Sequence, residues 1–116
     1  MAERCLLVDD SEAFLAAAVR RLESEGLEVV GCATHAEQAL ELVEAVRPDI
    51  VLVDVELGDE DGVELSERIR ELAEAPKVIL ISAYDKEEIA ELTKPAKVEY
   101  LPKNRLSAAA IAELTS

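Results

Sequence analysis

A small set of polar residues, each placed at the end of an apolar run, could carry out chemistry in this chain. The acidic pair Asp9-Asp10 follows the first run, Asp54 ends a mostly β-branched run, Ser82 ends a third, and Lys103 follows a fourth. Such runs are typical of strands that are buried on both faces of a parallel sheet. Because parallel strands end at one edge, where open α/β sheets place their ligands, we expect these residues to converge.

The chemistry expected of such a cluster is phosphoryl transfer. Three gathered carboxylates repel one another, and Mg²⁺ relieves that repulsion at a site with few carboxylates, because it keeps several of its waters. An ionised carboxylate beside the ion, here Asp54, can attack phosphorus and form an aspartyl phosphate. Lys103 would neutralise charge on the transferring group, and the Ser82 hydroxyl would donate a hydrogen bond to a phosphoryl oxygen.

The elements that must position these residues alternate along the chain. Five strands are expected, at residues 4–8, 27–32, 50–54, 77–82 and 98–101. A helix is expected after each strand, and this alternation predicts an α/β fold, a doubly wound five-stranded parallel sheet with helices on both faces. The chain, residues 1–116, is expected to form a single domain.

Capping and stop signals set the expected helix boundaries. Ser11 caps the first helix and Gly26 ends it, and a capping box of Thr34 and Glu37 opens the second. After a loop from Glu56 to Glu60, the third helix starts at Asp61 with Glu64, buries Leu65, Ile69 and Leu72, and is broken by Pro76. A short fourth helix starts at Asp85 with Glu88, and the last helix contains Ala108, Ile111 and Leu114.

Composition excludes several classes of function. With 12 basic and 26 acidic residues the net charge is −14, so we expect no direct binding of nucleic acid, and 3% aromatic residues supply no stacking platform. No apolar run is long enough to cross a bilayer, so we expect a cytoplasmic location without membrane contact. Cys5 and Cys32 are expected to be buried, reduced thiols, and His35 an exposed helix-start residue.

Taken together, the motifs resemble the receiver domain of two-component response regulators over essentially the whole chain. The matching segments are LLVDDS, PDIVLVDVELGDEDG, VILISA and YLPK. The resemblance implies a flavodoxin-like (CheY-like) fold with strand order 2-1-3-4-5. It also implies roles for individual residues: metal binding by Asp9, Asp10, Asp54 and the backbone carbonyl of Glu56, phosphorylation of Asp54, a hydroxyl switch at Ser82, a phosphoryl salt bridge from Lys103, and a rotamer change at Tyr100.

The resemblance also implies partners. A sensor histidine kinase or a histidine phosphotransfer protein would donate the phosphoryl group, and phosphorylation would favour a homodimer. The readout face would consist of the fourth helix, fifth strand and fifth helix. Pro102 before Lys103 and Asn104 after it resemble receivers of regulators with a LuxR-type helix-turn-helix domain. Such a C-terminal DNA-binding output domain would lie outside this chain.

Two alternatives remain open at this point. The chain could be a pseudo-receiver, which keeps the fold as a protein-interaction module without phosphorylation. It could also be a small Mg²⁺-dependent phosphatase, for which Glu56 is the only nearby second acid. The interpretation we favour is a signal receiver that is not itself an enzyme, although it assists its own phosphorylation and dephosphorylation.

Overall fold

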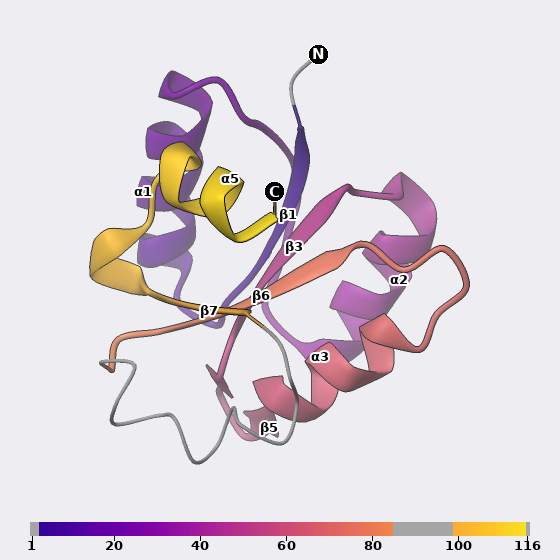
Figure 1. Ribbon diagram of the computed structural model, residues 1–116. Coiled ribbons are helices and arrows are strands. Elements are labelled where there is room, and N and C mark those ends of the chain that lie inside the picture. Colours follow the sequence, from indigo (N-terminus) through magenta and orange to yellow (C-terminus); the bar gives the residue numbers. More distant parts are fainter. Residues whose placement is uncertain (1–2, 85–98, 116) are drawn as a thin grey trace.

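A five-stranded parallel sheet forms the centre of the protein, and the computed structural model describes residues 3–84 and 99–115 of it (Figure 1). The strand order is β2-β1-β3-β6-β7, and every neighbouring pair is parallel. This is the predicted order, counting only the strands of this sheet. The strands are β1 (Arg4–Val8), β2 (Glu28–Ala33), β3 (Ile50–Asp54), β6 (Lys77–Ser82) and β7 (Glu99–Pro102).

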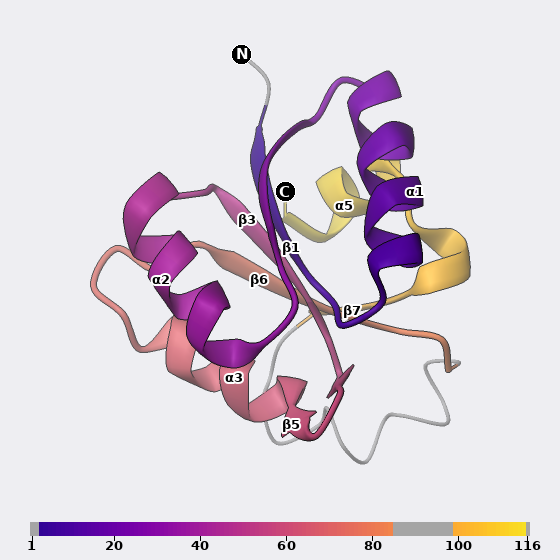
Figure 2. The ribbon, with the colours of Figure 1, turned by 180° about the vertical axis from the view of Figure 1, so that it is seen from behind.

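Helices cover both faces of the sheet, as predicted. Helices α1 and α5 lie on one face and α2 and α3 on the other, as the two opposite views show (Figures 1 and 2). Their bounds are α1 (Glu12–Ser24), α2 (Ala36–Val46), α3 (Gly62–Arg70) and α5 (Ala108–Thr115). The helix expected at Asp85 and Glu88 lies outside the described residues, as does Val98. No helix in residues 3–84 and 99–115 is long and apolar enough to cross a membrane.

The strands divide the core into two layers, because successive side chains point to opposite faces. In β1, Leu6 and Val8 pack with α2 and α3, whereas Cys5 and Leu7 pack with α1 and α5. All four are completely buried, as are the neighbouring β3 residues 51–53. Burial on both faces explains why these strands are read as unbroken apolar runs.

The start of α2 differs from the prediction by one residue. His35, rather than Thr34, is the N-cap, and its Nδ1 accepts a hydrogen bond from the Gln38 backbone N–H at 3.3 Å. The Gln38 side chain in turn accepts a hydrogen bond from the Thr34 N–H at 2.9 Å. The predicted capping box of Thr34 and Glu37 is therefore wrong, because Gln38 occupies the reciprocal position. His35 is exposed at the helix start, as expected.

The end of α3 also differs. The predicted cap, Asp61, accepts hydrogen bonds from the N–H groups of Val63 at 2.9 Å and Glu64 at 3.3 Å. The helix ends at Arg70, however, well before Pro76. Leu72 follows the helix and packs against the core from a turn, its N–H donating to the Ile69 carbonyl at 3.1 Å. The chain thus leaves the helix early, keeps Leu72 partly buried against the core, and then enters β6.

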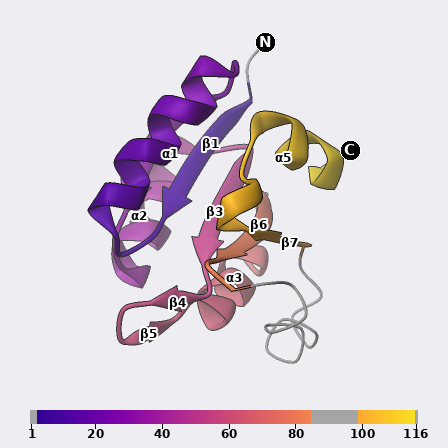
Figure 3. The ribbon, with the colours of Figure 1, turned by 90° about the vertical axis from the view of Figure 1, so that its left-hand side faces the viewer.

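Residues 56–61 form a small antiparallel hairpin where a loop was predicted. Strands β4 (Glu56–Leu57) and β5 (Glu60–Asp61) pair around a turn in which Gly58 has φ +61°. The hairpin lies at the end of the sheet to which the arrowheads of β1 and β3 point (Figure 3). Leu57 anchors it, with 1% of its surface exposed. The hairpin therefore gives a fixed shape to the segment that directly follows Asp54.

Both cysteines are free thiols, as expected; Cys5 is buried as predicted, whereas Cys32 is only partly buried. They lie on β1 and β2, where burial raises the pKa of Cys5 to about 12 and also raises that of Cys32. A thiol with a raised pKa carries little of the reactive thiolate at neutral pH. The two side chains are therefore part of the packing.

Gly62 is expected to be the least replaceable glycine, because it packs directly against the end of β3. A Cβ added there would lie 1.8 Å from the Asp54 carbonyl oxygen, whereas a Cβ at Gly26 would meet nothing within 4 Å. We expect Gly62→Ala to cost about 3 kcal/mol or more, through forced movement of the backbone. Gly26→Ala, at φ +99°, should cost about 1 to 2 kcal/mol from its backbone conformation alone. Urea unfolding measures both, and a Gly62→Ala protein as stable as Gly26→Ala would contradict this packing.

Candidate functional site

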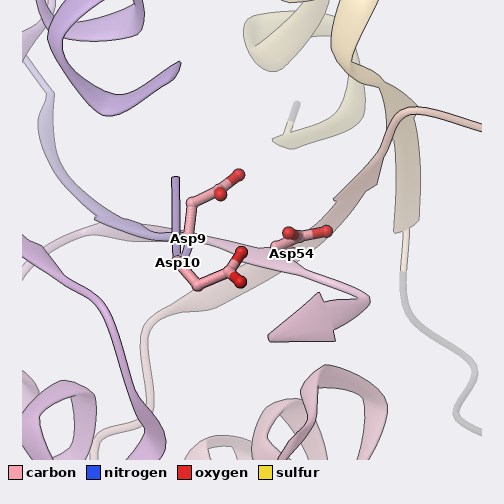
Figure 4. Close-up of side chains that lie close together, drawn as sticks. All are labelled: Asp9, Asp10 and Asp54. Atoms are coloured by element: carbon pink, nitrogen blue, oxygen red, sulfur yellow. The ribbon is translucent and has the colours of Figure 1, made fainter. Parts of the chain in front are cut away.

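The sheet brings three carboxylates together at the carboxyl ends of its strands. Asp9 and Asp10 follow β1 and Asp54 ends β3, and these strands are neighbours, with Val8 paired to Val53. One oxygen from each side chain lies within 4.8 Å of the others. Figure 4 shows the three side chains side by side. Segments far apart in the sequence thus supply one acidic cluster.

Lys103 provides a positive charge at this cluster. It follows β7, at the start of a short 3₁₀ turn, Lys103–Arg105. Its Nζ lies 2.6 Å from Asp9 Oδ2 and 3.4 Å from Asp54 Oδ2. Asp9 is completely buried and Asp54 is 5% exposed, so these pairs are shielded from solvent. One ammonium is therefore shared between two buried carboxylates.

Backbone amides orient the other carboxylate oxygens. The Ser11 N–H donates to Asp9 Oδ1 at 2.8 Å, and the Glu56 N–H donates to Asp54 Oδ1 at 3.2 Å. Asp9 Oδ2, although close to Lys103, has no hydrogen bond of good geometry. This oxygen is therefore held by its ion pair with Lys103, at 2.6 Å, and its remaining capacity to accept is free for a further positive partner.

The electrostatic environment makes the Asp54 carboxyl group a weaker acid than usual. Burial, and secondarily the charge of Asp9, raise the pKa of Asp54 to about 6, although Lys103 and the Glu56 N–H oppose the rise. Burial lowers the pKa of Lys103, but its interactions with Asp9 and Asp54 outweigh that effect and raise it overall. The single ammonium of Lys103 thus does not fully compensate the buried charges of Asp9 and Asp54.

Ser82 and Lys103 line the same hollow as Asp54. This hollow has a volume of about 220 Å³ and is also lined by Asp10, Glu56, Gly58, Ala83 and Tyr84. Ser82 Oγ accepts a hydrogen bond from the Tyr84 N–H at 3.1 Å, so its hydroxyl hydrogen can point to another acceptor. A larger hollow of about 710 Å³ lies at the opposite edge of the sheet, before β3 and β6, away from the acidic cluster.

Tyr100 is buried under this edge, with 7% of its surface exposed. Its hydroxyl donates a hydrogen bond to the Tyr84 backbone carbonyl. The aromatic side chain is therefore linked to the segment that follows Ser82. This is the arrangement in which a movement of residues 82–84 would reach Tyr100.

Phe14 is a neighbour of the site that sequence reasoning missed. The Lys103 ammonium lies 4.4 Å from the centre of the Phe14 ring, a cation–π contact. The Phe14 N–H donates to Ser11 Oγ at 3.2 Å, which holds the backbone of this residue in the first turn of α1. The sequence offered one indication of this contact: the only phenylalanine of the chain lies in the first turn of the helix that follows the acidic pair.

The donor set fits a hard divalent cation. All its side-chain ligands would be carboxylate oxygens, of which Asp10 is exposed to solvent and Asp9 retains a buried oxygen without a hydrogen bond. Mg²⁺ prefers oxygen ligands and keeps part of its water shell, which an open side at Asp10 permits. The Glu56 carbonyl belongs to the hairpin that borders the same hollow.

Comparison with known proteins identifies similar sequences and structures. A family model described as response regulator receiver domain matches residues 5–114. A protein-glutamate methylesterase/protein-glutamine glutaminase of Trichodesmium erythraeum is 40% identical over 86 residues, 69% of this chain and 23% of that protein. The transcriptional regulatory protein PdtaR of Mycobacterium tuberculosis is 30% identical over 101 residues, 86% of this chain and 49% of that protein. The chain therefore spans half or less of the length of these two relatives.

A solved structure matches nearly the whole chain. It is a two-component response regulator of the LuxR family from Aurantimonas sp. SI85-9A1, with a TM-score of 0.84 and 26% identity. The match covers 99% of this chain and 86% of that one. The similarity thus extends from the sequence to the complete fold.

Asp54→Asn is expected to stabilise the protein in the absence of metal at neutral pH. The pKa of Asp54 in the folded protein, about 6, lies above its ordinary value of 3.8. Ionising this side chain therefore costs stability, a cost that develops as the pH rises from the ordinary value to the folded value and is absent at lower pH. We expect a gain of about 1 to 3 kcal/mol in urea unfolding with EDTA at pH 7.5, and a smaller gain at pH 4.5.

The matched control is Asp59→Asn, in the exposed turn of the hairpin. It should change stability little at either pH. Equal gains at pH 7.5 and pH 4.5 for Asp54→Asn would contradict the explanation from ionisation.

Proposed function

Because this chain belongs to the response regulator receiver domain family of two-component systems, we propose that it is a phosphoacceptor whose reactive residue is Asp54. The observation that carries the proposal is the cluster at the sheet edge. Asp54 lies within 4.8 Å of the Asp9 and Asp10 oxygens, and Lys103 is shared between Asp9 and Asp54. This arrangement suits a transfer in which negative charge on the incoming group must be neutralised.

In the proposed reaction a carboxylate oxygen of Asp54 attacks the phosphorus of a phosphohistidine. The new O–P bond forms as the donor P–N bond breaks, and the imidazole leaves. The donor is a sensor histidine kinase or a histidine phosphotransfer protein. Asp54 must be ionised to attack, and a pKa of about 6 leaves most of it ionised at pH 7.5.

Asp9, Asp10, Asp54 and the Glu56 carbonyl are the proposed holders of Mg²⁺. When bound, the ion supplies positive charge at the transferring phosphoryl group and reduces the repulsion among the three carboxylates. The Lys103 ammonium, already 3.4 Å from Asp54 Oδ2, is placed to pair with a phosphoryl oxygen. The Ser82 hydroxyl lines the same hollow and can donate a hydrogen bond to another.

We propose that the phosphoryl group changes the conformation through Ser82 and Tyr100. Movement of Ser82 toward the phosphoryl group displaces the segment up to Tyr84, whose N–H and carbonyl bond to Ser82 and Tyr100 respectively. Phosphorylation then shifts an equilibrium between two states to the extent that their contacts differ. The proposed output is homodimer formation or control of a C-terminal DNA-binding domain. We further propose that residues 1–116 form a single receiver domain that acts in the cytoplasm. This domain itself would bind neither nucleic acid nor a membrane.

Incubation with acetyl phosphate and Mg²⁺ is expected to add one phosphoryl group to the protein, seen as a single shift in intact mass. EDTA and, separately, Asp54→Asn should abolish the shift, whereas Asp59→Asn should retain it. A full shift in Asp54→Asn would place the modification elsewhere. No shift, together with no beryllofluoride-induced change in the amide spectrum, would favour the pseudo-receiver alternative.

The phosphatase alternative makes a different prediction. It requires a second acid for repeated turnover, and the candidate, Glu56, is exposed on the hairpin. We expect no multiple turnover of p-nitrophenyl phosphate with Mg²⁺. Sustained release of nitrophenolate, lost in Glu56→Gln, would instead support a phosphatase.

A further inference from the structure

The β4–β5 hairpin is tied to both helices of one face as well as to the acidic cluster. Leu57 is buried in the core layer that also contains α2 and α3. Asp61 caps α3, as described above, and Glu60 Oε1 accepts a hydrogen bond from the Ala36 N–H at 2.8 Å. Ala36 is the first residue of α2. The hairpin is thus braced between the starts of two helices.

The Glu60 contact is chemically favourable. The first N–H groups of a helix have no partner within the helix, and their positive end attracts a carboxylate. His35 satisfies the N–H of Gln38, and Glu60 satisfies that of Ala36. Glu60 therefore supplies a cap for α2 from a segment that is distant in sequence.

The other end of the hairpin touches the acidic cluster. The Glu56 N–H donates to Asp54 Oδ1, and a Cβ built on Gly58 would lie 3.6 Å from Asp10 Oδ2. A small rotation of the hairpin would move the Glu56 N–H relative to Asp54 Oδ1, and Gly58 relative to the Asp10 carboxylate. The position of the hairpin relative to α2 consequently affects where the carboxylate oxygens of the cluster lie.

We propose that Glu60 is a positioning residue for Mg²⁺, acting by holding the β4–β5 hairpin against the start of α2. The inference rests on the proposed function, because the ion that it serves is the one assigned to Asp9, Asp10 and Asp54. Coupling between two equilibria is reciprocal. If the Glu60–Ala36 hydrogen bond favours binding of the ion, the bound ion also favours formation of that hydrogen bond. Metal occupancy is thereby communicated to the start of α2.

Mg²⁺ titration by calorimetry compares Glu60→Ala with Glu60→Gln. The amide oxygen of glutamine keeps an acceptor for the Ala36 N–H and removes the charge. We expect the Mg²⁺ dissociation constant to rise roughly threefold to tenfold in Glu60→Ala, the range of one modest hydrogen bond, and to change less than twofold in Glu60→Gln. Glu64→Ala, which removes a charge from the same hollow near Ala36, should behave like the unmodified protein.

Ala36→Pro tests the bond from its other side. Proline is well tolerated at the first position of a helix, and it removes the donor N–H without changing any charge. Its Mg²⁺ dissociation constant should rise as in Glu60→Ala, and the double variant should show no further loss, because both changes break one bond. Urea unfolding in EDTA establishes that each variant is folded.

The outcomes separate this inference from the proposed function. Equal weakening in Glu60→Ala and Glu60→Gln would overturn the positioning role in favour of simple charge, as would additive losses in the double variant. Unchanged affinity in both Glu60→Ala and Ala36→Pro would overturn it as well. If the unmodified protein binds no Mg²⁺ in the same titration, the metal site itself fails, and the inference falls with it.

Discussion

Two nearly inaccessible carboxylates, Asp9 and Asp54, share one ammonium, and the site depends on that shortage of positive charge. Moving an ionised carboxylate away from water is expensive, and a single partner rarely compensates two. The backbone N–H groups of Ser11 and Glu56 satisfy one oxygen of each. The remaining imbalance appears as an Asp9 oxygen without a hydrogen bond and as an Asp54 pKa of about 6. Such a cluster is well suited to attract a cation and an electrophile.

The parallel sheet is what allows this cluster to form. The three strands β1, β3 and β7 end at the same edge, so residues from the beginning, middle and end of the chain meet there. Both faces of β1 and β3 are covered by helices, so the strand ends are fixed by the core. The hairpin then extends this rigidity beyond the sheet, because Leu57 is buried and Gly62 packs on the Asp54 carbonyl. Because the strand ends are rigid, the Asp9 and Asp54 carboxylates stay close together although they repel each other.

Much of this organisation could be predicted from the sequence. The apolar runs define the three central strands β1, β3 and β6, because two-sided burial leaves no polar alternation. Parallel strands ending at one edge then bring Asp9, Asp54 and Lys103 together. The strand order came from the family resemblance. The hairpin was not predictable, because two-residue strands have no periodicity, and the cap at His35 depends on a ring nitrogen that serves as acceptor in one tautomer only. The contact of Phe14 with Lys103 joins two elements whose relative placement only the folded chain specifies.

The charge of the whole domain makes the dependence on a cation stronger. A phosphoryl donor is anionic, and it approaches a chain of net charge −14 whose reactive residue lies among two other acids. Exposed ion pairs such as Arg47 with Glu74 do little to offset this field, because solvent screens them. Lys103 is shielded instead, held by Asp9 and covered by the Phe14 ring. Under the proposed function, transfer to Asp54 converts a partner of this ammonium into a phosphoryl group with more charge and more oxygens. Lys103 is then drawn further toward Asp54, and the end of β7, which directly precedes it, is the segment that must follow.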